Sequence, residues 1–79
     1  MSSFESFFDK NIAQKIKYYR LSLGITQEKF SELLGKNDKY IGHIERGERK
    51  ISKNMIVEII EFLKIQPAEF FDFSEQYKY

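Results

Sequence analysis

The chain has 79 residues, of which 42% are hydrophobic, 16% aromatic and 32% charged, and it contains no cysteine. Disulfides are therefore excluded, and so is a structural zinc site, which as a rule needs four Cys or His ligands, because the sequence holds a single histidine. A domain this small buries only about 60% of the surface of its unfolded chain, so we expect a second subunit to cover some of the eight Phe and five Tyr rings.

The sequence carries no membrane or secretion signal. Its apolar runs are far shorter than the roughly 20 residues needed to cross a bilayer. Residues 1–9 lack the basic start and continuous apolar core of a secretory signal. We therefore expect a cytoplasmic protein that does not bind membranes, folded as one domain over residues 1–79 with frayed ends at residues 1–8 and 74–79.

Apolar residues recur at helical spacing along most of the chain, which predicts an all-α, compact five-helix fold. The first helix is expected to begin near Asn11 and to end at Gly24. The second begins after Thr26, an N-cap candidate with the acidic Glu28 in the turn that follows. It ends at Gly35, because glycine can adopt the left-handed conformation that often follows a helix.

The last three predicted helices are short. The third runs from residue 38 to about residue 46, and Asn37 is placed to cap it. The fourth begins after Ser52, another N-cap candidate, and Pro67 suits the first turn of the fifth. No segment alternates apolar and polar residues at period two, so no strand is predicted.

Charge is distributed unevenly along the chain. Residues 10–53 carry eleven basic side chains against five acidic ones, a surplus of six. Residues 1–9 carry two acidic side chains, and residues 54–79 carry five against two basic ones. The formal net charge of +1 therefore conceals a basic centre between acidic ends, and such a centre is suited to binding phosphates.

The short glycine-containing turn at residues 35–37 sets the second and third helices at a steep angle, which predicts a helix-turn-helix over about residues 26–46. The characteristic residues of this region are Arg20-x3-Gly24-Ile25-Thr26-Gln27-Glu28-x-Phe30-x2-Leu33-Leu34-Gly35, Tyr40-Ile41-x2-Ile44-Glu45-Arg46-Gly47-x-Arg49 and Phe70-Phe71. This pattern resembles the Cro and lambda-repressor-like (XRE) family of DNA-binding regulators over residues 12–71. Residues 44–52 are similar in particular to the controller proteins of restriction–modification systems.

The resemblance implies that the third helix enters the major groove of DNA. Because Ile41 and Ile44 must face the core, the opposite side of that helix, including Gly42, is the candidate recognition surface. The candidate base contacts are Asp38, Lys39, Tyr40 and His43.

Three of these residues have an alternative role. Lys39 suits guanine, whereas Asp38 suits either a cytosine amino group or the positive N-terminus of the third helix. Core packing is the alternative for Tyr40, and a solvated surface position is the alternative for His43.

Seven residues are candidates for phosphate contacts: Gln27, Lys36, Asn37, Arg46, Arg49, Lys50 and Lys53. Gln27 matches the family position that hydrogen-bonds a phosphate and braces the third helix. The basic residues from Arg46 onward follow that helix in a loop, where they suit phosphates or a narrowed minor groove. The resemblance assigns Arg20 and Glu45 to a partly buried ion pair.

Together these features predict a transcription regulator that binds palindromic operators in double-stranded DNA as a homodimer, with no metal, cofactor or small-molecule effector. The expected dimer surface comprises Ile60, Phe62, Leu63, Ile65, Phe70, Phe71, Phe73 and Tyr77. An enzyme is not expected, because the sequence offers no nucleophile and base pair and no glycine-rich phosphate loop. The alternative is a helical protein-interaction module, such as an antitoxin-like or antirepressor-like dimer, which would not need a basic centre.

Overall fold

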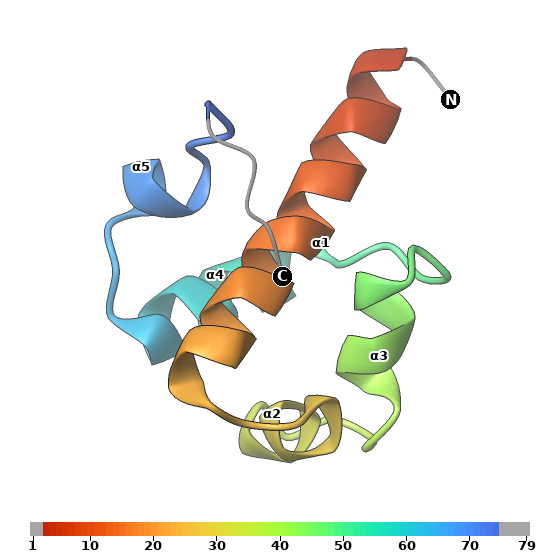
Figure 1. The fold of residues 1–79 in the computed structure, drawn as a ribbon, viewed down its shortest axis with the longest axis vertical. Helices are drawn as coiled ribbons and strands as arrows, with labels where there is room; N and C mark the ends of the chain where they lie inside the picture. Colours follow the sequence, from red (N-terminus) through yellow and green to blue (C-terminus); the bar gives the residue numbers. More distant parts are fainter. Residues whose placement is uncertain (1–2, 75–79) are drawn as a thin grey trace.

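The computed structural model describes residues 3–74, and within them it contains five helices and no strand (Figure 1). The helices are α1 (Ser3–Leu23), α2 (Gln27–Leu33), α3 (Tyr40–Glu45), α4 (Lys53–Leu63) and α5 (Pro67–Phe70). The prediction of an all-α fold is thereby confirmed. None of the helices in this part of the chain has both the length and the apolar character needed to cross a bilayer.

Local signals in the sequence fix several helix ends. The Thr26 hydroxyl accepts a hydrogen bond from the Lys29 backbone N–H at 3.0 Å, and the Ser52 hydroxyl accepts one from Met55 at 3.1 Å. Each bond satisfies an amide of the first turn that has no partner within its own helix. Gly35 follows α2 with a φ of +71°, in the left-handed region that its lack of a Cβ permits.

The N-terminal helix is longer than the sequence predicts. It begins at Ser3, about two turns before the expected start near Asn11, so the prediction of a frayed segment is wrong for residues 3–8. The cause is a set of aromatic contacts with the other end of the chain. Phe8 stacks on Phe71 with ring centroids 6.2 Å apart and meets Phe73 edge to face at 5.8 Å. Part of the aromatic surface expected to need a second subunit is thus covered within the chain.

The hydrophobic core draws on all five helices. Its buried members are Ile12, Ile16, Tyr19, Phe30, Tyr40, Ile41, Ile44, Met55, Ile59 and Phe70. Phe70 is 0% exposed and stacks on the Tyr19 ring at 6.2 Å. The structure therefore corrects the assignment of Phe70 to the dimer surface, because a fully buried side chain cannot contact a second subunit.

Buried polar contacts attach α5 to α1. The Lys15 side chain is almost fully buried, and its Nζ donates to the backbone oxygen of Glu69 at 2.9 Å. The Tyr19 hydroxyl donates to the Glu69 carboxylate at 2.6 Å. Because a buried ammonium needs hydrogen-bond partners of this kind, Lys15 belongs to the interior and does not contribute to a basic surface.

Replacement of Ile16 by Ala should lower the free energy of unfolding by about 2–5 kcal/mol, because Ile16 is 0% exposed and its loss leaves a cavity in the core. Leu21→Ala on the same helix is the matched control, since Leu21 is 44% exposed and should change stability by no more than about 0.5 kcal/mol. Urea denaturation followed by circular dichroism measures both. Equal effects of the two substitutions would contradict this description of the core.

Candidate nucleic-acid interface

A buried serine joins α2 to α3. Ser31 is 0% exposed, and its hydroxyl donates to the Gln27 backbone oxygen at 2.8 Å and accepts from the Ile41 backbone N–H at 2.9 Å. The Ile41 amide lies in the first turn of α3 and lacks a partner within that helix. Ser31 therefore anchors the start of α3 on α2. The sequence analysis missed this residue, although a small polar side chain next to the inward-facing Phe30 was an available signal.

An ion pair connects α3 to α1 and to the start of α2. Arg20 and Glu45 form two hydrogen bonds, Nε to Oε2 at 2.7 Å and Nη2 to Oε1 at 3.1 Å. The Gln27 amide nitrogen donates to the same carboxylate at 3.0 Å. A third guanidinium nitrogen of Arg20 donates to the Ile25 backbone oxygen. Gln27 thus braces α3 through its nitrogen.

Gly42 is buried, which corrects its expected place on the open side of α3. The side chains of Gln27 and Arg46 lie over it. A Cβ at this position would come within 2.9 Å of Gln27 Oε1 and 3.0 Å of Arg46 Nη1. The absence of a side chain at Gly42 is what lets these two polar groups lie against α3.

Two of the candidate base-reading residues stand exposed at the start of α3. Asp38 and Lys39 are exposed and occupy the turn that leads into the helix, while His43 is half-buried one turn later. The side-chain oxygen of Asn37 accepts from the Lys39 backbone N–H at 2.9 Å, so Asn37 orders this turn. The turn therefore presents Asp38 and Lys39 in a fixed backbone conformation.

Tyr40 occupies the core position that the sequence left as its alternative. It is 6% exposed. Lys36 Nζ lies 5.4 Å and Arg49 Cζ 5.1 Å from the centroid of its ring. Both contacts are cation–π interactions. Burial raises the pKa of the Tyr40 hydroxyl, and the nearby Arg49 charge opposes part of that rise. Tyr40 is thus a neutral platform that orients two basic side chains.

The segment after α3 has ion pairs of its own. Arg46 Nε lies 3.2 Å from Glu48 Oε1, and His43 Nε2 lies 4.0 Å from the same oxygen. The hydrogen bond from Arg46 lowers the pKa of the Glu48 carboxyl, which stays charged at neutral pH. Glu48 therefore offsets part of the positive charge that the sequence places directly after α3.

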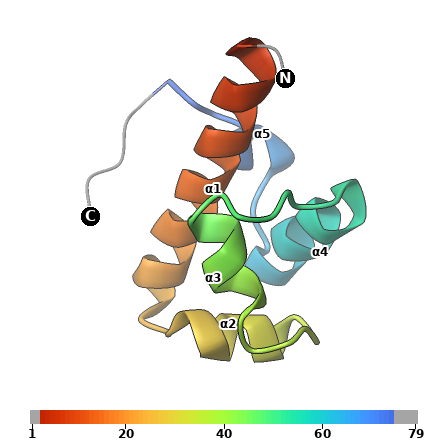
Figure 2. The same cartoon turned by 90° about the vertical axis from the view of Figure 1, so that its right-hand side faces the viewer.

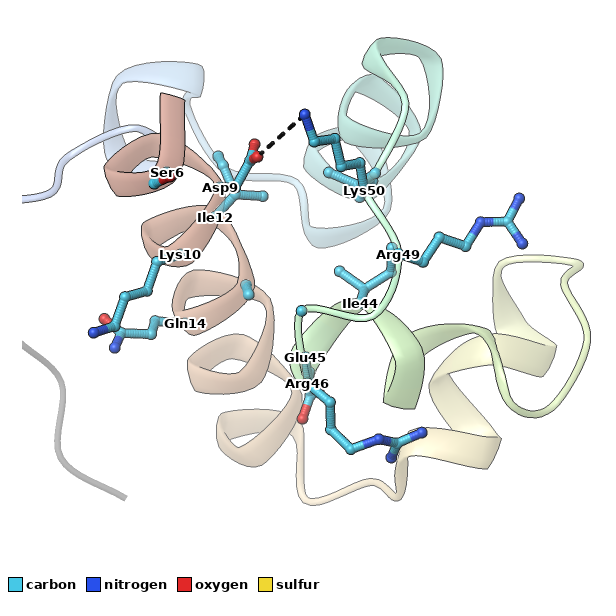
Figure 3. Close-up of a pocket in the computed structure, with 13 residues that line it drawn as sticks. Ser6, Asp9, Lys10, Ile12, Gln14, Ile44, Glu45, Arg46, Arg49 and Lys50 are labelled. Atoms are coloured by element: carbon cyan, nitrogen blue, oxygen red, sulfur yellow. Dashed lines mark ion pairs between the residues drawn. The ribbon is translucent and has the colours of Figure 1, made fainter. Parts of the chain in front are cut away.

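The basic side chains between α3 and α4, those of Arg46, Arg49 and Lys50, point in different directions. In Figure 2, α2, α3 and the segment that joins α3 to α4 face the viewer together. Figure 3 shows Lys50 turned toward the N-terminal end of α1, with Arg46 and Arg49 pointing elsewhere. Lys50 Nζ lies 3.1 Å from Glu5 Oε2 and 3.8 Å from Asp9 Oδ2. The structure thus keeps Arg46 and Arg49 apart from Lys50.

The remaining residues lie elsewhere on the surface. Lys36 is exposed beside Tyr40, whereas Lys53 starts α4 and lines a groove on the side of α4 and α5. Between residues 3 and 74, no three His, Cys, Asp or Glu side chains come close enough to hold a metal ion.

The expected dimer residues are divided between surface and interior. Phe62 and Phe71 are exposed, while Ile60, Leu63, Ile65 and Phe73 are partly buried against the core. Tyr77 lies outside the described residues.

Comparisons with known proteins agree with this arrangement. A helix-turn-helix family model, HTH_3, matches residues 16–70. Control protein C.BamHI of Bacillus amyloliquefaciens is 37% identical over 62 residues, which covers 77% of this chain and 76% of that protein. No solved structure matches the chain at a significant level.

Ser31→Ala should lower the free energy of unfolding by about 1–3 kcal/mol, because it leaves the buried Ile41 amide without an acceptor. Ser22→Ala is the matched control: its exposed hydroxyl donates to the Tyr18 backbone oxygen one turn earlier, and its loss should cost no more than about 0.5 kcal/mol. Chemical denaturation measures the difference. A Ser31→Ala variant as stable as Ser22→Ala would show that this bond does not hold α3.

Proposed function

The chain belongs to the helix-turn-helix family HTH_3 of DNA-binding regulators, and from that premise we propose that it binds palindromic operators as a homodimer and thereby regulates transcription. The family is one of regulators and not a class of enzymes. The similarity to a control protein supports the more specific role of a controller in a restriction–modification system. The observation that carries the proposal is the exposed turn before α3, which presents Asp38 and Lys39 at the start of a helix that Ser31 and Glu45 hold in place.

Base reading is assigned to the residues that the fold leaves exposed on α3 and its preceding turn. Lys39 would donate to the O6 and N7 atoms of guanine, and Asp38 would accept from the amino group of cytosine. His43, one turn later, would reach the next base or the sugar–phosphate edge. Tyr40 leaves this set because its ring is buried, and its role becomes the orientation of Lys36 and Arg49.

Phosphate contacts are assigned to Lys36, Asn37, Arg46 and Arg49, which are all exposed around α3. Gln27 is proposed to act by bracing α3, since its amide nitrogen is engaged by Glu45. These contacts position the protein on the duplex and carry no sequence information of their own. Their number sets how steeply the affinity falls with salt.

An apolar groove of about 630 Å³ is the proposed site of dimer formation. Its lining combines α4 and α5 with the N-terminal part of α1 and includes Phe8, Ile56, Val57, Ile60, Pro67 and Phe71. Val57 is 47% exposed and is one of several apolar side chains that this chain leaves open to solvent. A second copy of the chain would cover this surface, and the exposed Phe62 lies on the same helix.

Charge on α4 favours a two-fold arrangement. Lys53 and Glu61 both line the groove and lie four residues before and four residues after Val57. In a two-fold dimer the same patch meets itself, so a pair of antiparallel α4 helices centred on Val57 brings Lys53 of one protomer to Glu61 of the partner subunit. For this reason we assign Lys53 to the dimer surface in place of the phosphate contacts.

Fluorescence anisotropy with a random duplex and with duplexes selected from a random library tests DNA binding. Lys39→Ala should reduce the preference for the selected sites by about 1–3 kcal/mol, because a base contact is lost.

Arg49→Ala should weaken binding to all duplexes alike and reduce the slope of log affinity against log salt by about 1, because a phosphate contact is lost. A chain that shows no salt-sensitive binding at 50 mM salt would instead favour the protein-interaction module.

Charge reversal tests the dimer. Val57→Asp should weaken self-association at least ~10-fold, because it buries an unpaired carboxylate at the centre of the interface. Lys53→Glu alone should also weaken the dimer, and adding Glu61→Lys should restore it by recreating the pair with reversed signs. Sedimentation equilibrium measures the association constants. A wild-type chain that stays monomeric both alone at tens of micromolar and on DNA would contradict the proposal.

A further inference from the structure

Lys50 pairs with two carboxylates from the N-terminal part of the chain, those of Glu5 and Asp9. Glu5 and Asp9 lie four residues apart, and this spacing places them on the same face of α1. Glu5 Oε2 is 3.1 Å and Asp9 Oδ2 is 3.8 Å from Lys50 Nζ, across a separation of more than forty residues in sequence. Figure 3 shows the Lys50 side chain directed at this face of α1, along one edge of a cavity of about 470 Å³.

Both sides of this contact are anchored by other interactions. The first turns of α1 are tied down by Phe8, which packs against Phe71 and Phe73. On the other side, Arg49 is positioned over the Tyr40 ring and Ile51 packs against the core. The approach of Lys50 to the acidic face of α1 therefore follows from the fold and does not depend on two loose side chains meeting.

The contact is nevertheless open to water. The side chains of Lys50, Glu5 and Asp9 are 58%, 49% and 39% exposed. Exposed ion pairs of this kind contribute only about 0.2–1 kcal/mol, so the lysine can exchange one anionic partner for another. A DNA phosphate is such a partner, and Lys50 belongs to the segment that directly follows the recognition helix.

We propose that Glu5 and Asp9 compete with DNA phosphate for Lys50, so that the N-terminal turns of α1 lower the affinity of the chain for DNA of any sequence. This inference rests on the proposed function. It assigns the N-terminal turns a role in setting how strongly the protein holds non-specific DNA. An ammonium already paired with carboxylates releases less free energy on meeting a phosphate, so Lys50 in the wild-type chain contributes little to binding.

The double variant Glu5→Gln/Asp9→Asn removes both charges and keeps the size of both side chains. Its affinity for a random duplex at 50 mM salt should rise about 1.5- to 5-fold per protomer. The slope of log affinity against log salt should steepen by about 0.9 for the added phosphate contact. The helical circular dichroism signal, compared with that of the wild-type chain, reports whether α1 is intact.

Lys50→Gln provides the matched controls. In the wild-type chain it should lower the affinity less than about 2-fold, and in the double variant it should abolish the gain. A gain that persists without Lys50 would show a long-range effect of the two charges and would overturn the proposal. So would a large loss from Lys50→Gln in the wild-type chain, which does not depend on how the double variant folds.

The proposed function and this inference fail in different ways. A wild-type chain that binds no duplex refutes DNA binding itself. A wild-type chain that binds DNA, with a double variant of equal or lower affinity, refutes only the competition for Lys50. In that case the carboxylates would serve to hold the segment after α3 in place for binding.

Discussion

The ion pair between Arg20 and Glu45 is the interaction on which the placement of α3 depends. It is the point where α1, the start of α2 and the end of α3 meet, because Gln27 donates to the same carboxylate. Almost no water reaches the Glu45 side chain, so a missing partner would leave a buried charge uncompensated, at a cost of about 3–5 kcal/mol. Such an ion pair contributes little net stability, but it ties the end of α3 to α1 and to the start of α2.

The sequence predicted the features that depend on near neighbours. The caps at Thr26 and Ser52 and the turn at Gly35 act within a few residues of themselves, so their signals are local. Among distant contacts it predicted only the pair of Arg20 and Glu45, through the family resemblance, and it missed those that join α1 to the C-terminal part of the chain. The early start of α1 depends on Phe71 and Phe73, and the interior position of Lys15 depends on α5. The spacing of apolar residues within α1 predicts neither contact.

The same limit applies to the basic centre of the chain. A count along the sequence treats every Lys and Arg in residues 10–53 as surface charge, whereas the fold gives several of them internal partners. Lys15 is bound to the Glu69 backbone, Arg20 pairs with Glu45, and Lys50 pairs with the acidic face of α1. Fewer cations then remain to gain free energy from phosphates by releasing counterions. The fold therefore leaves fewer cations available for binding DNA of any sequence than the count along the sequence indicates.

The contact of Phe8 with Phe71 and Phe73 also determines when the chain can finish folding during its synthesis. Phe8 leaves the ribosome more than sixty residues before Phe71 and Phe73, its ring partners. Domains complete their folding only when the last packing residues are available. Because Phe8 and Phe71 both line the groove on α4 and α5, that surface exists only after residue 73 has emerged. The dimer proposed above could therefore form only between copies that have each closed their own core.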